Sequence, residues 1–317
     1  MLESINIREF RGIKRMESSL DLTDFSIILG RNNAGKSSFM EAIYLLFGGN
    51  DPVSGRDRFS RIKSMRGNNN LSYRYDGKGS ISYQINGFPG KTEMNSQIRK
   101  IEIGKLNTSR NIRPSDLRHA NLDFDNSDAL TMLFHSSYQE SKNMLSDLQS
   151  SRQRIEREGG HVRAAELISE CVGDEYTEIY LESLEARKKP SGEDPYYVKI
   201  KDLGNGVARM IPIFMAIETY EPKILLWDDI STSLHPSLMR MVLRWLNEKD
   251  MQVIASTHSI DVLSALLDVM PDDGSVHQFS KSETDVLSHN TLSLSELEIL
   301  MNDAGLDPRF LSDEFEL

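Results

Sequence analysis

The chain has 317 residues, of which 38% are hydrophobic, so it can form one large domain or two modest domains around a buried core. Its single cysteine excludes internal disulfide bonds and cysteine-rich metal sites, and its net charge of −11 argues against a protein that coats nucleic acid with its whole surface. The longest mostly apolar run, at 208–217, is about half of what a membrane-spanning helix needs, and no apolar signal-peptide block opens the chain, so we expect a cytoplasmic protein with no membrane segment.

Charge is unevenly distributed along the chain. Residues 52–120 hold 14 Lys and Arg against 5 Asp and Glu, whereas residues 121–317 hold 17 against 36. A solvated loop region would explain the basic segment, and so would a local contact with the phosphate backbone of DNA or docking onto an acidic partner. These three alternatives stay open for residues 52–120.

The N-terminal third alternates short runs of β-forming residues with turn residues. Strands are predicted at 4–10, 16–22 and 24–30. A helix over 36–47 is predicted from the spacing of Phe39, Ile43, Leu46 and Phe47. Residues 53–70 are predicted to form an exposed basic loop. An antiparallel β flap is predicted from the runs at 71–75, 80–85 and 99–106.

The remaining two thirds predict a buried strand at 128–137 and then a helical stretch. Residues 138–189 have helical spacing interrupted at 158–160, which predicts two or three helices that are too short for a long coiled-coil arm. From residue 195 strands are predicted at 196–200, 224–227, 251–256 and 276–280, and helices at 206–220, 237–248, 259–269 and 293–304. This alternation predicts an α/β fold with a largely parallel central sheet covered by helices on both faces.

A phosphate-binding loop is predicted where the strand at 24–30 meets the helix at 36–47. The sequence GRNNAGKSS matches the pattern GxxxxGK[ST] in the required strand-to-helix context. Glycines let backbone N–H groups surround the phosphates, the helix N-terminus adds its dipole, Lys36 reaches the terminal phosphates and Ser37 ligates Mg²⁺. The motif predicts that ATP and Mg²⁺ are bound by Gly30, Arg31, Asn32, Asn33, Ala34, Gly35, Lys36, Ser37 and Ser38.

Two adjacent carboxylates end the apolar strand in ILLWDDISTSLHP. A protein with a phosphate-binding loop needs an acid at such a strand end to hold Mg²⁺, and Asp228 fits that place. Asp229 would then face the terminal phosphate as the general base or orienting group for the attacking water. A pair of acids can also merely open a turn, but the separate phosphate-binding loop favours the catalytic interpretation.

The stretch ESINIREFRGIKRMESSLDLTDFSIILGRNNAGKSSFMEAIYLLFG resembles the opening of the ABC-type ATPases of the RecF, SMC and OLD (overcoming lysogenization defect) group. The similarity covers about 1–50 and 195–265. The resemblance implies a composite site that forms when two heads meet, the phosphate-binding loop of one facing a signature loop of the other. The counterpart here opens LGNGVARMIPIFMAI with Leu203, Gly204, Asn205 and Gly206, and it departs from the family pattern because Gly204 replaces the usual serine.

The same resemblance suggests further site residues. His258 in VIASTHSIDVL is similar to the family's switch histidine, which contacts the terminal phosphate, and the loop 231–235 would cross between the heads. For the family's glutamine near Mg²⁺, Gln139 is the candidate and Gln84 the rival. Two arginines beside the first strand would pack near the adenine, namely Arg8 and Arg11.

Three units are expected along the chain. They are a nucleotide-binding lobe with the phosphate-binding loop and the basic β region at 1–127, a helical insert at 128–194, and a half at 195–317. This last half carries the signature loop, the acidic Walker B motif at 228–229 and the switch histidine. About fifty residues follow the last matched motif, too few for the nuclease domain of OLD-type proteins, so any nuclease would be a separate chain.

The leading functional hypothesis is an ATPase head that dimerises on ATP and acts as a motor or switch in DNA maintenance or in defence against foreign DNA. A slow or non-hydrolysing ATP-gated clamp that docks an effector is the alternative. A small-molecule or nucleotide kinase shares the phosphate-binding loop but would need no signature loop. The family usually has Glu where this chain has Asp229, and Asp is shorter by one methylene, about 1.5 Å of reach. We therefore predict slow hydrolysis and a long-lived ATP-bound dimer.

Overall fold

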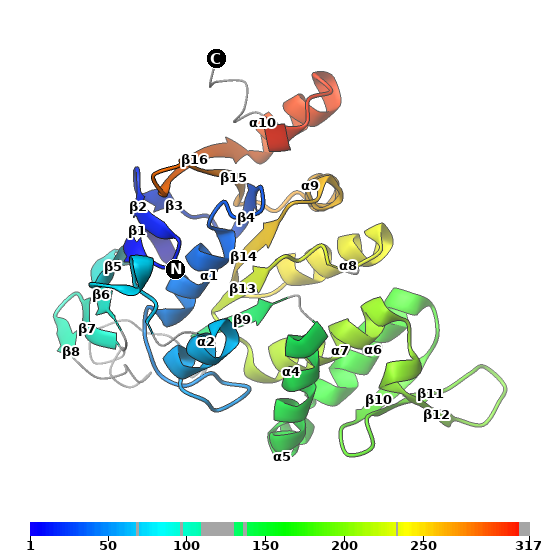
Figure 1. The fold of residues 1–317 in the computed structure, drawn as a ribbon. Helices are drawn as coiled ribbons and strands as arrows, with labels where there is room; N and C mark the ends of the chain where they lie inside the picture. The colour runs from blue at the N-terminus through cyan, green and yellow to red at the C-terminus, as the bar shows by residue number, and fades with distance from the viewer. Residues whose placement is uncertain (68–69, 96–97, 109–129, 136–137, 233, 311–317) are drawn as a thin grey trace.

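The computed structural model describes residues 1–67, 70–95, 98–108, 130–135, 138–232 and 234–310, and these are built around one mixed sheet (Figure 1). Within them thirteen strands join in this sheet, in the order β8-β7-β6-β5-β1-β2-β16-β15-β4-β14-β13-β9, with β3 paired to β1. No helix in these ranges is long and apolar enough to cross a membrane.

Five neighbouring strands form the parallel core of the sheet. They are β9 (Thr131–His135), β13 (Ile224–Asp228), β14 (Gln252–Thr257), β4 (Phe25–Gly30) and β15 (Gly274–Lys281). Runs such as IILG and ILLW are buried on both faces, as parallel strands covered by helices require. The predicted fold class is confirmed, and parallel pairing brings the carboxyl ends of these strands to one edge.

The other half of the sheet is mainly antiparallel. It consists of β16 (Val286–Ser293), β2 (Ile13–Met16), β1 (Leu2–Phe10), β5 (Gly79–Ile85), β6 (Phe88–Met94), β7 (Ile98–Ile103), β8 (Leu106–Thr108) and the short β3 (Leu20–Asp21). The predicted flap is confirmed, but β6 was missed because Pro89 and Gly90 interrupt its pattern. Gly90 leaves room for the ring of Tyr83, since a Cβ atom there would stand 2.2 Å from Tyr83 Cε2.

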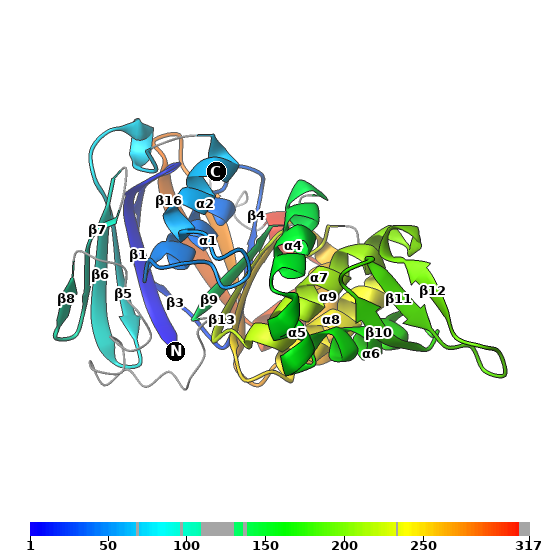
Figure 2. The ribbon, with the colours of Figure 1, turned by 90° about the horizontal axis from the view of Figure 1, so that it is seen from below.

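Helices cover both faces of the sheet. α1 (Lys36–Leu45) and α2 (Arg58–Arg66) lie between the parallel core and the antiparallel half (Figure 2). α7 (Asn205–Tyr220), α8 (Pro236–Asn247) and α9 (Ile260–Val269) pack on the opposite face. Alternate residues of β13 serve the two layers, because Leu226 joins the core with α1 whereas Leu225 and Trp227 join the core with α7 and α8.

A separate helical lobe precedes α7. It contains α4 (Tyr138–Ser150), α5 (Arg152–Glu158) and α6 (Gly160–Val172), which confirms the predicted helices. Residues 174–189, however, are not helical. β10 (Tyr176–Tyr180), β11 (Glu185–Lys188) and β12 (Tyr196–Lys199) form a small antiparallel sheet, so the strand predicted at 196–200 does not belong to the main sheet. Ile179 and Ala186 are paired across β10 and β11 and are both buried, and this cross-strand pair stabilises the small sheet.

Several local predictions were wrong. The basic loop predicted at 53–70 contains α2, which Asp57 caps by accepting the Ser60 N–H at 2.8 Å and which ends at Gly67 with φ 63°. The strand predicted at 71–75 is a short 3₁₀ turn, Tyr73–Tyr75. Of the strand predicted at 16–22, only Met16, the last residue of β2, and the two residues of β3 are in strands. β16 was missed, and the final helix is shorter than predicted, α10 (Leu294–Glu298) followed by a π turn at Ile299–Asp303. The unit boundaries at 127/128 and 194/195 stay predictions.

Candidate functional site

The phosphate-binding loop lies at the carboxyl edge of β4, where the strand passes into α1. Gly35 has φ 95°, a conformation that side chains disfavour, and a Cβ atom on Gly30 would stand 2.8 Å from the Phe279 carbonyl oxygen. No side chain among the described residues caps the first turn of α1. The loop therefore presents backbone N–H groups of the helix N-terminus to the cleft in front of it, which is the geometry that binds phosphate.

Lys36 points into this loop. Its Nζ donates to the Gly30 carbonyl oxygen at 2.6 Å and to the Arg31 carbonyl oxygen at 2.9 Å. Burial lowers the pKa of Lys36, although the charges of Asp228 and Asp229 oppose the shift. The two carbonyl partners are neutral, so the ammonium is available to an anion that enters the cleft.

Asp228 ends β13 and receives hydrogen bonds from the two strands beside it. His135, at the end of β9, places Nδ1 3.1 Å from Oδ2, and Ser256, in β14, donates from Oγ to Oδ1 at 2.7 Å. Burial alone would raise the pKa of Asp228, but hydrogen bonding and charge from His135, with hydrogen bonds from Ser37 and Ser256, lower it to about 2. Asp228 is therefore a fixed negative charge in contact with the Ser37 hydroxyl.

Asp229 has a different environment, although it is the next residue. Its backbone is left-handed, with φ 60°, and its carboxylate accepts hydrogen bonds from Ser231 Oγ at 2.8 Å and from Thr232 Oγ1. His258, after β14, places Nδ1 3.3 Å from Asp229 Oδ1. The side chain of Asp229 is 36% exposed against 13% for Asp228, so the second acid faces the open part of the cleft.

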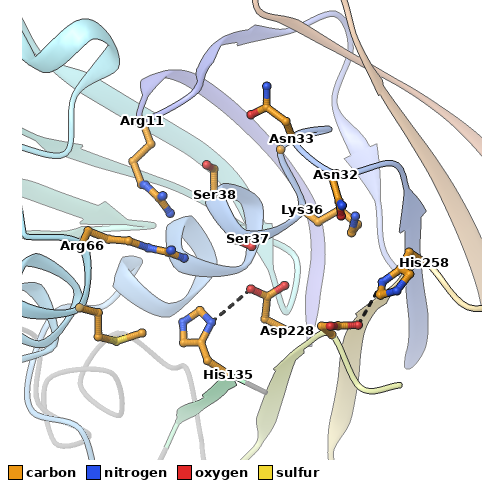
Figure 3. A pocket seen from close by; sticks show the side chains of 13 residues that line it. Arg11, Asn32, Asn33, Lys36, Ser37, Ser38, Arg66, His135, Asp228 and His258 are labelled. Atoms are coloured by element: carbon orange, nitrogen blue, oxygen red, sulfur yellow. Dashed lines mark hydrogen bonds and ion pairs between the residues drawn. The ribbon is translucent and has the colours of Figure 1, made fainter. Parts of the chain in front are cut away.

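These groups line one cleft of about 580 Å³ (Figure 3). The structure brings together the predicted residues Asn32, Asn33, Gly35, Lys36, Ser37, Ser38, Asp228, Asp229 and His258. Of the two adenine candidates, Arg11 lines the cleft, whereas Arg8 is exposed along β1. Gln139 lies in the first turn of α4, but its side chain falls outside the described residues. Its rival Gln84 is exposed on β5, opposite Ser4, and does not line the cleft.

The predicted signature residues Leu203, Gly204, Asn205 and Gly206 do not line this cleft. Gly204 and Asn205 are exposed where α7 begins, and within the part of the chain that the structure describes no side chain caps that helix start. One turn further, burial lowers the pKa of Arg209, while the charge of Asp229 opposes the shift. In the crossing loop Ser231 contacts Asp229, His235 caps α8, and Ser233 lies outside the described residues.

Three residues that line the cleft were not predicted from the sequence, namely Met65, Arg66 and His135, and neither was Glu41, the ion-pair partner of Arg66. Glu41, one turn beyond Ser37 in α1, is fully buried and forms ion pairs with Arg11 and with Arg66 of α2. His135 stands between Asp228 and Glu41, and its Nε2 has no hydrogen-bond partner within the described residues. Glu41 could have been found from its i+4 spacing after Ser37, whereas Arg66 and His135 depend on the placement of α2 and β9.

The donor set fits a nucleotide with Mg²⁺. The Ser37 hydroxyl and the Asp228 carboxylate supply hard oxygen ligands, and Lys36 with the helix N-terminus supplies phosphate donors. Among the described residues there is no cluster of three or more His, Cys, Asp or Glu that would hold a metal by itself. A cation held by two protein oxygens and completed by phosphate and water is the usual arrangement for Mg²⁺ at nucleotide sites.

The fold and the cleft together define a nucleotide-binding head with a phosphate-binding loop and an acid at the end of the neighbouring strand. Residues 1–189 match the family described as AAA ATPase domain, and the chain belongs to that family. Residues 174–264 match a second AAA domain family, whose description names the AbiEii toxin of type IV toxin–antitoxin systems. The chain is thus an ATP-binding domain of the AAA ATPase kind.

Solved structures show the same fold at low sequence identity. An SMC head domain from Thermotoga maritima superposes with a TM-score of 0.53 at 16% identity, over 92% of this chain and 99% of that one. An SMC head domain from Pyrococcus furiosus, with an extended coiled coil and bound to the C-terminal domain of ScpA, gives 0.58 at 13%, over 96% and 99%. An SMC head bound to the winged-helix domain of ScpA gives 0.57 at 15%, over 93% and 98%. The fold is therefore that of ABC-type ATPase heads.

One relative of known sequence is similar over a short stretch. An uncharacterized protein of Methanocaldococcus jannaschii is 41% identical over 67 residues, which are 21% of this chain and 27% of that protein's length. The match spans well under two thirds of that relative, and its description names no activity.

Proposed function

We propose that this ATP-binding head hydrolyses ATP in a homodimer that closes on the nucleotide, and that it acts as a slow molecular switch. The observation that carries the proposal is the division of the required groups. Lys36, Ser37, Asp228, Asp229 and His258 surround one cleft, whereas the uncapped start of α7 at Gly204 and Asn205 lies outside that cleft. A second copy could supply its α7 start to the terminal phosphate of ATP.

Closure of such a dimer would depend on the terminal phosphate. A nucleotide that contacts both copies stabilises the closed state only by its differential affinity for that state, so loss of the terminal phosphate would release the copies. Bound Mg²⁺ would neutralise phosphate charge and orient the phosphates for attack. Within the chain, Asp228 would hold a fixed charge, and Asp229 with His258 would orient the attacking water and accept its proton.

Slow turnover is supported by the contacts of Asp229. Its carboxylate accepts hydrogen bonds from Ser231 and Thr232 on its own loop, and its side chain is one methylene shorter than the family's usual Glu. A base whose carboxylate is engaged in this way would act on the attacking water only after these hydrogen bonds break. The alternative, an ATP-gated clamp that holds an effector without turnover, uses the same closed dimer and differs only in the rate.

The basic segment gives weaker support for DNA contact than its net charge indicates. Arg58 is 4% exposed and donates to the Thr131 carbonyl oxygen, and Arg61 pairs with Asp51 at 2.6 Å. On the flap, Lys91 pairs with Glu93. Much of the basic excess is therefore used within the fold, and Lys78 and Lys105 are among its exposed remainder. A role in DNA maintenance or defence, with a separate nuclease or effector chain, is proposed on the family resemblance alone.

The dimer is tested with Asp229→Asn, which keeps the side-chain size and removes the base. Light scattering after size exclusion should report a monomer without nucleotide and a stable dimer with ATP and Mg²⁺. The same substitution combined with Lys36→Ala should stay monomeric, because the phosphate ligand is lost. A monomer for Asp229→Asn at saturating ATP, with ATP binding shown by calorimetry, would refute the dimer. Steady-state phosphate release by the unmodified chain separates the switch from the clamp.

A further inference from the structure

An exposed aromatic side chain stands on the turn between α2 and β5. Tyr75 is 68% exposed, the largest value among the large hydrophobic side chains in the described ranges, whereas Tyr73 two residues earlier is 8% exposed. Within those ranges Tyr75 makes no ring contact, while the guanidinium of Arg74 covers the ring of Tyr73 at 5.2 Å. A tyrosine ring left in water forgoes most of the free energy that its burial would contribute.

The turn holds this ring out at a conformational cost. Arg74 and Tyr75 both have left-handed backbones, with φ 52° and 61°, and neither is a glycine. Such a conformation costs about 1–2 kcal/mol for each residue with a side chain. Asn70 compensates by donating from Nδ2 to the Tyr75 carbonyl oxygen at 2.8 Å and accepting the Ser72 N–H at 2.9 Å. Strain that is maintained by a dedicated hydrogen-bond network is typical of binding residues.

The turn is attached to the rim of the nucleotide cleft. The Arg11 N–H donates to the Leu71 carbonyl oxygen at 2.8 Å, and Phe10 forms a bridge with Ser72. Tyr73 donates its hydroxyl to Asp285 at 2.8 Å, in the turn between β15 and β16. Figure 2 shows the turn, in cyan, beside the β1–β2 turn and the β15–β16 turn.

The cleft itself has a direction. Asp228 and His258 lie toward one end, where the terminal phosphate belongs, and Ser38 and Arg11 lie toward the other (Figure 3). A triphosphate bound along the loop would therefore direct its nucleoside out past Ser38 and Arg11. Because the Arg11 backbone N–H is hydrogen-bonded to Leu71, at the start of the segment that leads to the turn, the nucleoside would emerge on the side of the cleft to which this turn is attached.

We propose that Tyr75 is the stacking surface for the nucleobase and makes the site select purine over pyrimidine nucleotides. The inference rests on the proposed ATP site and adds the residue that contacts the nucleobase and discriminates between bases. Stacking on an aromatic ring grows with overlap, so a two-ring base gains more than a one-ring base. The cost of the strained turn is then offset when the base covers the ring.

The experiment compares three ligands on the full chain by calorimetry: ATP, CTP and tripolyphosphate. Tyr75→Asn is the test variant, because asparagine tolerates a left-handed backbone and lacks a ring. It should weaken ATP binding by about 10-fold or more, bring ATP and CTP to similar affinities, and leave tripolyphosphate binding unchanged. Tyr75→Phe should behave like the unmodified chain. Tyr197→Asn, at a tyrosine 51% exposed on β12 of the helical lobe, is the matched control and should change none of the three affinities.

Two results would overturn the inference. An unchanged ratio of ATP to CTP affinity in Tyr75→Asn shows that the ring does not read the base, even if DNA or partner binding falls. An equal loss for ATP and tripolyphosphate shows damage to the phosphate site rather than loss of stacking. A chain that binds none of the three ligands would instead refute the proposed ATP site, so the two failures are distinguishable.

Discussion

Asp229→Glu tests whether the shorter acid limits the rate. The substitution adds one methylene, about 1.5 Å of reach. The longer side chain would leave its hydrogen bonds with Ser231 and Thr232 and extend toward the cleft. A general base within hydrogen-bond reach contributes about 10²- to 10⁴-fold, and recovery of part of that should raise phosphate release on the order of tenfold. In activation free energy this is about 1.4 kcal/mol.

The same substitution should destabilise the fold. Asp229 occupies a left-handed backbone, φ 60°, which aspartate tolerates better than glutamate, and the hydroxyl hydrogen bonds would be lost. Together these effects amount to about 2 kcal/mol in the free energy of unfolding. We expect a melting temperature lower by about 3 °C, measured by scanning calorimetry without nucleotide.

Asp229→Gln is the matched control for both measurements. Glutamine has the reach and the backbone cost of glutamate but is no base, so it should melt like Asp229→Glu and release phosphate more slowly than the unmodified chain. Equal or slower phosphate release by Asp229→Glu, at saturating ATP and with normal ATP affinity, would refute the reasoning. The site would then be built around the shorter acid, and the slow switch would lose its main support.

Three further outcomes are expected. Lys36→Ala should abolish detectable ATP binding in calorimetry while the melting temperature stays within a few degrees, because the hydrogen-bond partners of Lys36 in the described part of the chain are two loop carbonyl oxygens; retained micromolar binding would contradict this. Burial, with the nearby charge of His289, lowers the pKa of His277 to about 4. As the pH falls below about 6.5, His277 is therefore protonated in the unfolded chain while it stays neutral in the folded protein. Stability should therefore fall by about 2 kcal/mol from pH 7 to pH 5, and His277→Gln should flatten that dependence in urea unfolding; an equally steep dependence in the variant would exclude His277 as its cause. Charge reversal at Lys78 and Lys105 should lower DNA affinity and flatten its salt dependence, and unchanged binding in a filter assay would assign the basic segment another role.

The sequence predicts the parts of the site whose geometry is local. The phosphate-binding loop is contained in nine consecutive residues between a strand and a helix, so the pattern alone places Lys36 and Ser37. Asp228 follows from the apolar run before it, because a buried parallel strand has its carboxyl end at the ligand edge. These three residues can be predicted without knowing which strands are neighbours in the sheet.

The parts that the sequence did not predict depend on contacts between distant segments. His135 reaches Asp228 only because β9 pairs with β13 in parallel, with His135 opposite Asp228 in the register. Arg66 reaches Glu41 only because α2 packs beside α1. The helix itself was hidden by its polar composition, since Phe59 and Ile62 supply its fully buried apolar side chains. Asp57 and Gly67, a helix-capping residue and a helix-ending residue, were the available signals.

The two adjacent acids at the end of β13 have different surroundings. Asp228 is still in register with β9 and β14, so His135 and Ser256 hold both of its oxygens and keep it ionised. Asp229 lies beyond the end of the strand, and its left-handed backbone directs the chain into the next loop. The Ser231 hydroxyl of that loop donates a hydrogen bond to the Asp229 carboxylate. The first acid cannot move without breaking the sheet edge, whereas the second moves with its loop. If hydrolysis is gated, the gate is therefore the loop of Ser231 and Thr232. Ser231→Ala, which removes one of the hydrogen bonds that hold Asp229, should raise phosphate release without any change in ATP affinity, and a rate that stays the same would exclude that gate.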